Sequence, residues 1–469
     1  MYIAIDEGTT NLKVVIFDDN FKAIKLIKEK VSTYYPQEGW VEQNMDDVWK
    51  SLINILRKLP IQYKEIEGLG ITNQRETTVL WDSTTGKTVY NAIVWQCRRT
   101  AKMIEELKKE YGEIIKEKTG LEPDPYFSAS KIKWLLDRFP KIKERAKEGR
   151  IKFGTVDTYL LWKLTGGKVH ATDHTNASRT MIYNIRNRNW DDELLEIFDI
   201  PEEMLPEIKD SAGYFGETQI YNKKIEITGI IGDQQSALLA HGGIKEGDMK
   251  ITYGTGTFLL LNTGNSIEIK KGILTTVAWS INGTTNYALE GSILSSGSVV
   301  EWLKSIGLWS DISEEENSVY FVPAFSGLGS PYWDPLARGA IFGITQKTKK
   351  IDITRAALES IGYMVRDIIE EMGKEIRIIM ADGGMTENDF LMQFQADITG
   401  IPVRVPDMKD MTARGAAILS AIGKGNITIK DIKPPEKYRE YRPMKDHTWR
   451  EKRYKKWKDA VRRSMRWDE

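Results

Sequence analysis

The chain has 469 residues, more than one hydrophobic core normally organises, so two to four domains are expected. It carries 67 basic and 67 acidic residues, and this balance excludes a strong net attraction to nucleic acid or to an anionic membrane. A single cysteine, Cys97, excludes an internal disulfide and a cysteine-based zinc site, and four scattered histidines argue against a histidine-rich metal centre. No leader-like segment opens the sequence and no apolar run approaches membrane-spanning length, so we expect a cytoplasmic protein without a membrane span.

A glycine-centred turn between two apolar runs begins the chain. Residues 2–5 and 12–17 are rich in β-branched side chains, and Gly8 lies between them, which predicts a β-hairpin. Successive backbone N–H groups at such a turn can bind an anion. The alternative is a surface hairpin whose polar side chains only satisfy the turn.

The side chains of this turn suit a nucleoside triphosphate. Thr9, Thr10 and Asn11 provide hydrogen-bond donors, and Lys13 provides a positive charge. Asp6 ends the first strand and is a hard oxygen ligand of the kind that Mg²⁺ prefers beside phosphate. We therefore expect a phosphate and Mg²⁺ site here.

Strands and helices then alternate, which predicts an α/β layered fold with ligands at strand ends. Strands are expected near residues 24–31, 66–72, 79–82 and 92–95, and helices over residues 47–59, 99–117, 130–139 and 157–164, the first of them capped by Asp46.

A polar cluster, Asn-Gln-Arg-Glu-Thr-Thr, follows the strand at residues 66–72. Arg75 and Glu76 within it could clamp vicinal hydroxyls, one donating and one accepting, or could form an ordinary surface ion pair. Trp95, Tyr126 and Phe258 could form the walls of a small polyol site, although lone aromatic side chains more often belong to a core.

An apolar strand over residues 225–231 leads to Asp233. The carboxylate there could accept the proton of a substrate hydroxyl that attacks a γ-phosphate, or it could cap the helix expected over residues 236–241. Gly242-Gly243 ends that helix, and we place the domain boundary there, giving domains 1–241 and 242–469.

Residues 250–261 repeat the design of the opening hairpin. Gly254-Thr255 corresponds to Gly8-Thr9, and Thr252 stands where Asp6 stood. This internal repeat indicates two related halves that grip one phosphate chain from opposite sides, with a metal-type carboxylate in the first half alone.

The remaining elements complete the second half. We expect helices over residues 295–306, 353–372, 388–400 and 412–422, and a strand over residues 376–380 that leads to the loop Asp382-Gly383-Gly384. That loop suits close approach to a ligand, although a plain turn explains it equally well. The basic and aromatic tail places Tyr454, Trp457, Val461 and Met465 on one helical face, which favours a docked helix over a nucleic-acid-binding arm.

Several runs resemble the FGGY family of carbohydrate kinases, and within it the members that phosphorylate glycerol. They include DEGTT, GITNQRETT, NAIVWQCRRT, GDQQSALLAHG, TYGTGTFLLLNTG, YALEG, SGLGSPYWDP and DGGMTENDFLMQFQAD, and they span nearly the whole chain. The resemblance implies two actin-like (ribonuclease H-like) domains that flank a catalytic cleft. It also implies ATP as co-substrate, Mg²⁺ as cofactor and glycerol as acceptor, and it is compatible with a homo-oligomer.

The resemblance also implies residue roles. Asp233 corresponds to the catalytic base, and Asp6 and Asp233 to metal-side carboxylates. The expected substrate-binding residues are Arg75, Glu76, Trp95, Tyr126, Asp233, Gln234 and Phe258. The expected nucleotide-binding residues are Thr9, Thr10, Asn11, Lys13, Thr255, Gly297, Glu301, Gly384 and Asn388.

Three positions depart from the family pattern. Glu7 stands where bacterial members usually have Gln, Lys13 replaces Arg, and Glu301 replaces Gln. Lysine keeps the charge of arginine but loses its bidentate fork, and Glu301 adds negative charge near the nucleotide.

The function expected from the resemblance is the ATP-dependent phosphorylation of glycerol to sn-glycerol 3-phosphate. A kinase for a larger sugar such as xylulose or gluconate is one alternative. An actin-like or Hsp70-like ATP switch without catalysis is another, but such a switch has no need of Arg75, Glu76 and Asp233.

Overall fold

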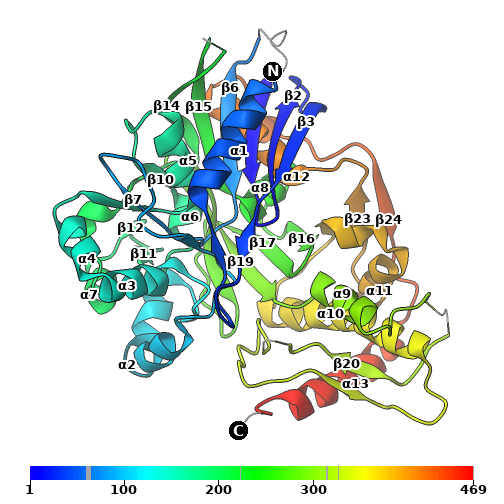
Figure 1. The fold of residues 1–469 in the computed structure, drawn as a ribbon. Coiled ribbons are helices and arrows are strands. Elements are labelled where there is room, and N and C mark those ends of the chain that lie inside the picture. Colours follow the sequence, from blue (N-terminus) through cyan, green and yellow to red (C-terminus); the bar gives the residue numbers. More distant parts are fainter. Residues whose placement is uncertain (60–64, 222, 313–314, 326, 468–469) are drawn as a thin grey trace.

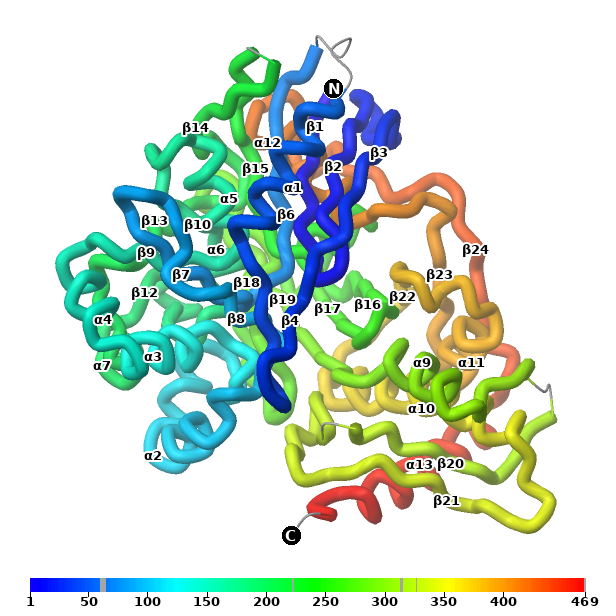
Figure 2. The backbone as a smooth tube through the Cα atoms, in the orientation of Figure 1, coloured from blue at the N-terminus to red at the C-terminus, as the bar shows by residue number. Residues whose placement is uncertain are grey.

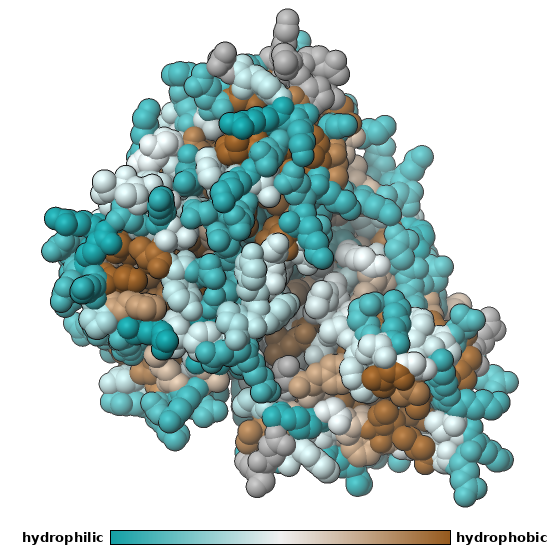
Figure 3. Space-filling model, in the orientation of Figure 1, coloured by the Kyte–Doolittle hydropathy of each residue, from teal (hydrophilic) through white to brown (hydrophobic). Residues whose placement is uncertain are grey.

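The computed structural model describes residues 1–59, 65–221, 223–312, 315–325 and 327–467, which form two α/β lobes (Figures 1 and 2). Figure 1 shows the blue to green lobe above and to the left of the lobe that contains α9, α10 and α13. Among the helices of the described residues, none is both long and apolar enough to span a membrane. Hydrophilic side chains cover much of the face seen in Figure 3.

The first lobe contains most elements up to α8. Its strands are β1 (Tyr2–Glu7), β2 (Asn11–Phe17), β3 (Ala23–Lys30), β4 (Thr33–Tyr34), β5 (Glu42–Gln43), β6 (Gly68–Asn73), β7 (Val79–Asp82), β8 (Ala92–Ile93), β9 (Ile151–Gly154), β10 (Ala171–Asp173), β11 (Tyr183–Asn184), β12 (Asn189–Trp190), β13 (Glu207–Lys209), β14 (Ala212–Ile220) and β15 (Lys223–Gly232). Its helices are α1 (Met45–Arg57), α2 (Ala101–Thr119), α3 (Ser128–Arg138), α4 (Pro140–Lys147), α5 (Val156–Leu164), α6 (His174–Ala177), α7 (Asp192–Phe198) and α8 (Asp233–Ala240), with a 3₁₀ turn at Glu202–Met204.

The second lobe follows the same plan. Its strands are β16 (Met249–Tyr253), β17 (Thr257–Gly264), β18 (Leu274–Ile281), β19 (Thr284–Ile293), β20 (Tyr320–Val322), β21 (Ala340–Phe342), β22 (Ile379–Asp382), β23 (Val403–Pro406) and β24 (Tyr438–Tyr441). Its helices are α9 (Gly297–Ser305), α10 (Lys350–Met372), α11 (Asp389–Thr399), α12 (Met411–Gly423) and α13 (His447–Ser464), with 3₁₀ turns at Gly384–Glu387 and Ile429–Asp431.

The two lobes repeat one strand order. The first has β3-β2-β1-β6-β15, and the second has β19-β17-β16-β22-β23. In each set the first three strands are antiparallel neighbours, and the third pairs in parallel with the fourth, as the fourth does with the fifth. The internal repeat that the two Gly-Thr turns predicted is therefore confirmed, as is the two-lobed α/β fold. β14 and β18 join the sets through one pair, Ala212 with Ile281.

Helix α12 of the later part of the chain packs on the sheet of the first lobe. It contacts β1, β6, β15 and α8. Glycines allow the backbones to meet: a Cβ added to Gly70 would lie 2.1 Å from the carbonyl oxygen of Ala416, and one added to Gly229 would lie 2.8 Å from the nitrogen of Ser420. The helix predicted over residues 412–422 is confirmed as α12, and its Ala and Gly residues permit this close packing.

Some predicted helix ends were wrong. Asp46 does not cap α1; the N-cap is Asn44, whose side chain accepts hydrogen bonds from the N–H groups of Asp46 and Asp47. An amide oxygen two or three residues earlier satisfies the free N–H groups of the first turn equally well. Helix α8 begins at Asp233 rather than Ser236, because Gly232 already has the extended backbone of an N-cap.

The predicted tail helix is confirmed as a docked helix. Trp457 and Val461 of α13 are buried, and Tyr454 and Met465 pack against the same core. Burial of this apolar face leaves most of the basic side chains of α13, such as Lys452, Lys455 and Lys456, toward solvent, whereas Arg453 is buried.

We expect Gly70→Ala to lower the free energy of unfolding by about 3 kcal/mol or to prevent folding, because α12 must move away from β6. Urea unfolding measures this. The matched control is Gly112→Ala in α2, where the nearest atom would lie 3.4 Å away and alanine should stabilise the helix by about 0.5–1 kcal/mol. Equal stability of the two variants would contradict the close packing.

Candidate functional site

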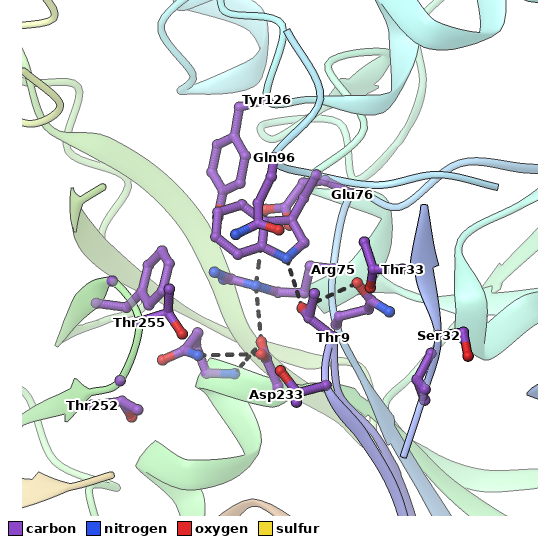
Figure 4. A pocket seen from close by; sticks show the side chains of 18 of the residues that line it. Thr9, Ser32, Thr33, Arg75, Glu76, Gln96, Tyr126, Asp233, Thr252 and Thr255 are labelled. Carbon is purple, nitrogen blue, oxygen red and sulfur yellow. Dashed lines mark hydrogen bonds and ion pairs between the residues drawn. The ribbon is translucent and has the colours of Figure 1, made fainter. Parts of the chain in front are cut away.

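A cavity of about 790 Å³ opens between the lobes, with Thr9, Arg75, Glu76, Tyr126, Asp233 and Thr255 among its side chains (Figure 4). It lies near the carboxyl ends of β1, β6, β15 and β16, where α/β proteins bind ligands. Of the predicted site residues, it brings together Thr9, Thr10, Arg75, Glu76, Trp95, Tyr126, Asp233, Gln234, Thr255 and Phe258.

Arg75 and Glu76 follow β6 and are buried, so they are not the surface ion pair that their sequence also allowed. The Nε of Arg75 lies 3.9 Å from Glu76 Oε1, and each side chain has a nearer partner. Glu290 on β19 accepts two hydrogen bonds from Arg75 at 2.6 and 2.8 Å. Arg179 donates to Glu76 from its Nε at 2.6 Å.

Asp233 is the first residue of α8 and points into the cavity (Figure 4). Its Oδ1 accepts the N–H of Gln234 at 2.7 Å and lies 3.3 Å from the Nε of Arg75. The N-cap position belongs to Gly232. Because 27% of its side chain is exposed, the carboxylate is held in place but remains accessible from the cavity.

Three aromatic rings form one wall. Trp95 meets Tyr126 and Phe258 edge to face, with centroids 5.6 and 5.7 Å apart. The indole Nε1 of Trp95 donates to the hydroxyl of Thr9 at 2.9 Å, and that hydroxyl donates to Gln74 at 3.2 Å. The aromatic wall and the first Gly-Thr turn are therefore directly connected.

A second cavity of about 680 Å³ adjoins the first, and Thr252 lines both. It contains Lys13 and Gly384 of the predicted nucleotide-binding residues. The Nζ of Lys13 lies 2.8 Å from Asp410, just before α12, so this ion pair connects β2 to the start of the helix that packs on the same sheet.

The second lobe has a carboxylate that the repeat argument missed. Asp6 pairs in register with Thr72 on β6, whereas Thr252 pairs with Asp382 on β22. The carboxylate and the threonine have thus exchanged strands. Asp382 lines the second cavity, accepts the hydroxyl of Thr252 at 2.5 Å and contacts His241 Nε2 at 2.9 Å. A comparison of the residues at the ends of the neighbouring parallel strands in the two halves of the sequence could have identified Asp382.

Asp6 is buried at the end of β1, 3.5 Å from Lys13. Burial raises the pKa of Asp6 to about 6; Lys13 opposes the rise, and the charges of Asp233 and Asp410 add to it. Asp6 itself lines neither cavity, but its carboxylate and that of Asp233 repel each other, and such hard oxygens are the ligands that Mg²⁺ takes together with phosphate oxygens and water. Within the described residues, no group of three or more His, Cys, Asp or Glu side chains could hold a metal by itself.

Four predicted nucleotide-binding residues line neither cavity in the described structure: Asn11, Gly297, Glu301 and Asn388. Gly297 begins α9 and donates its N–H to the carbonyl of Gly254, and the side chain of Asn388 caps α11. The side chain of Glu301 is 73% exposed and pairs with Lys304 at 2.8 Å. Their contact with a nucleotide stays a prediction.

Sequence reasoning missed several buried polar residues that support the site. They are Gln74, Lys131, Arg179, Lys250 and Glu290. Lys131 on α3 donates to the carbonyls of Tyr126 and Glu76 at 2.6 and 3.3 Å. Nothing in the local pattern around Lys131 or Lys250 distinguishes either from a surface lysine.

Glu7 shows how the chain tolerates glutamate in place of glutamine. Both of its carboxyl oxygens face the amide nitrogen of Gln74, at 3.0 and 3.1 Å. Burial raises the pKa of Glu7 to about 8, against the effect of the Gln74 hydrogen bond. At neutral pH the side chain is therefore mainly uncharged, as glutamine is.

Two family models cover most of the chain. The N-terminal domain model of the FGGY family of carbohydrate kinases matches residues 1–240, and the C-terminal domain model matches residues 249–423. The chain belongs to the FGGY family of carbohydrate kinases. It is 47% identical to glycerol kinase 2 of Sulfolobus acidocaldarius, over 99% of this chain and 98% of that protein. It is also 47% identical to the glycerol kinase of Thermococcus kodakarensis, over 99% of this chain and 97% of that protein.

Solved structures agree with this FGGY assignment. The crystal structure of Plasmodium falciparum glycerol kinase with ADP is similar to the chain with a TM-score of 0.91 at 35% identity, over 99% of this chain and 98% of that one. The gluconate kinase of Lactobacillus acidophilus has a TM-score of 0.87 at 21% identity, over 98% of this chain and 97% of that one, which shows the shared fold alone.

The buried Lys131 predicts a pH dependence of stability. Burial lowers the pKa of Lys131 to about 7. Between pH 7 and about 10.4, the unfolded chain then binds a proton that the folded chain lacks, so this group makes the free energy of unfolding rise with pH, by up to about 1.4 kcal/mol per pH unit. Urea unfolding of Lys131→Met at pH 7, 8 and 9 should lack that slope.

The matched control for this experiment is Lys133→Met. Lys133 lies on the same helix, where its Nζ is 3.3 Å from Asp137 and its side chain is 21% exposed. This variant should keep the slope of the unsubstituted chain. The same slope in all three proteins would contradict the assignment to Lys131.

Proposed function

We propose that the chain phosphorylates glycerol with ATP and yields sn-glycerol 3-phosphate and ADP. One observation carries the proposal: Asp233 lines the same cavity as the polar and aromatic pocket residues and as Thr9 and Thr255 of the two Gly-Thr turns (Figure 4). A three-carbon polyol in the pocket would point a terminal hydroxyl at this carboxylate. The 46–47% identity to glycerol kinases along the full chain supports the same acceptor.

Different residues of the pocket would bind the hydroxyl groups and the C–H faces of the polyol. Arg75 can donate to a hydroxyl oxygen and Glu76 can accept a hydroxyl proton, while Gln234 can do either. The rings of Trp95 and Phe258 cover the C–H faces of a short polyol and exclude water. Ordering of the acceptor in this way accounts for much of the rate of a phosphoryl transfer.

Asp233 is the proposed base. As the substrate oxygen bonds to the γ-phosphorus and the bond to the β–γ bridging oxygen breaks, the hydroxyl proton passes to Asp233, and the electron pair of the broken bond stays on ADP. Arg75, 3.3 Å from Asp233, keeps the carboxylate oriented toward the cavity.

The nucleotide would extend from the first cavity into the second. Thr9, Thr10 and Thr255 would donate to phosphate oxygens, and Lys13 would face the same negative charge. Asp6 and Asp233 would hold Mg²⁺, which supplies charge neutralisation on the phosphates when it is bound. The domain division at residue 242, the cytoplasmic location and the number of subunits stay predictions.

We expect Asp233→Asn to lower kcat by about 10³-fold, since an amide cannot accept the proton, while KM for glycerol changes little. A coupled ADP assay measures both. Asp137→Asn, at an exposed position of α3 that does not line the cavity, is the control and should behave as the unsubstituted chain does. Near-normal turnover of Asp233→Asn would rule out its role as the base.

The acceptor is tested in the same assay with glycerol, dihydroxyacetone, xylulose and gluconate. We expect glycerol to have the highest kcat/KM. A higher value for xylulose or gluconate would replace glycerol with a larger sugar, and ADP release without any acceptor dependence would favour an ATP switch.

A further inference from the structure

Four buried charges are linked to one another at the pocket: Arg75, Glu76, Arg179 and Glu290. Their side chains are 0–2% exposed. Glu290 binds both terminal nitrogens of Arg75, at 2.6 and 2.8 Å, and lies 3.1 Å from a terminal nitrogen of Arg179. Arg179 in turn donates its Nε to Glu76 at 2.6 Å. The set is neutral overall, with two positive and two negative groups.

Neighbouring residues of opposite charge in such a site should bind each other. Attraction between unit charges is far stronger in a dry interior than in water, so Arg75 and Glu76 alone would form a direct pair. A polyol needs the same donors and acceptors, and a direct pair would consume them. In the structure, each of the two charges has a separate counterion, and Arg75 Nε stays 3.9 Å from Glu76 Oε1.

The backbone of Glu76 contributes to this separation. Its φ is 61°, a left-handed conformation that is unfavourable for a residue with a side chain. Its carbonyl accepts hydrogen bonds from the hydroxyls of Ser128 and Thr78 at 3.0 and 3.2 Å and from Lys131 at 3.3 Å. The strained turn is thus held by three donors, and it directs the carboxylate toward Arg179.

Arg179 and Glu290 also connect to other parts of the pocket. The guanidinium of Arg179 lies 5.4 Å from the ring centroid of Tyr126, a cation–π distance. Glu290 comes from β19 of the second lobe, whereas the other three residues precede residue 240. Neither Arg179 nor Glu290 lines the cavity, so in this arrangement neither side chain can contact a bound substrate directly.

We propose that Arg179 and Glu290 are positioning residues that keep Arg75 and Glu76 apart, so that both remain available to the hydroxyls of the acceptor. This inference rests on the proposed function, because it takes Arg75 and Glu76 as the polyol-binding pair. It predicts that loss of the outer pair reduces affinity for the acceptor even where the fold is intact.

The test compares stability with KM. Arg179→Met and Glu290→Gln each leave a buried charge without its partner, so each single variant should have a lower melting temperature and a KM for glycerol raised at least 10-fold. The double variant is again neutral, and Arg75 and Glu76 are free to pair. We expect it to regain most of the lost melting temperature, whereas KM for glycerol stays at least 10-fold raised and KM for ATP changes less than 3-fold.

Recovery of KM together with stability in the double variant would overturn the inference, because a merely structural role predicts parallel recovery. If the double variant does not fold, Arg179→Lys provides the test. Lysine keeps the charge but cannot reach Glu76 and Glu290 with separate nitrogens in the same way, so KM for glycerol should rise about 5-fold. An unchanged KM in a folded Arg179→Lys variant would also overturn it.

Two controls separate this inference from the proposed function. Arg453 and Glu359 form a buried ion pair between α13 and α10, and neither residue lines the cavity. The double variant Arg453→Met with Glu359→Gln should alter stability without altering KM for glycerol. Arg75→Met and Glu76→Gln should raise KM for glycerol; if they do not, the proposed pocket is wrong rather than the role of the outer pair.

Discussion

The arrangement of the site depends on the close contact between α12 and the sheet of the first lobe. Gly70 and Gly229 on the strands, and Gly415 on the helix, remove the side chains that would hold these backbones apart; a Cβ on Gly415 would lie 2.0 Å from the carbonyl oxygen of Ser236 on α8. Because α8 begins with Asp233, the contact between α12 and α8 also fixes the position of the Asp233 carboxylate in the cavity.

The repeated lobes do not present identical chemistry to the ligand. Each offers a Gly-Thr turn, but the carboxylate lies on the third strand of the set, β1, in one lobe and on the fourth, β22, in the other. Asp6 therefore faces Lys13, while Asp382 is bound by Thr252 and His241. One carboxylate has a lysine beside it, and the other is already bound by neighbouring donors, so the two Gly-Thr turns lie in different electrostatic surroundings.

The departures from the family pattern have local explanations. Glu7 is accommodated because burial favours its uncharged form, against the opposing effect of its hydrogen bond with Gln74. Lys13 reaches Asp410 and Asp6 as a single point charge, so the loss of the arginine fork leaves the link between β2 and the start of α12 in place. Glu301 projects from α9 toward solvent beside Lys304, where water screens its charge.

The sequence by itself determined the strand-turn-strand motifs, the duplication and the docked tail helix, because these depend on local periodicity and on glycine and threonine at fixed spacing. It also determined about half of the residues that line the cavity. The partners of those residues were decided only by the tertiary structure. Glu290 lies 215 positions from Arg75 along the chain, and Arg179 lies 103 from Glu76. No local pattern encodes which buried carboxylate meets which guanidinium; that depends on how two sheets and α12 pack, and burial then makes each pairing obligatory.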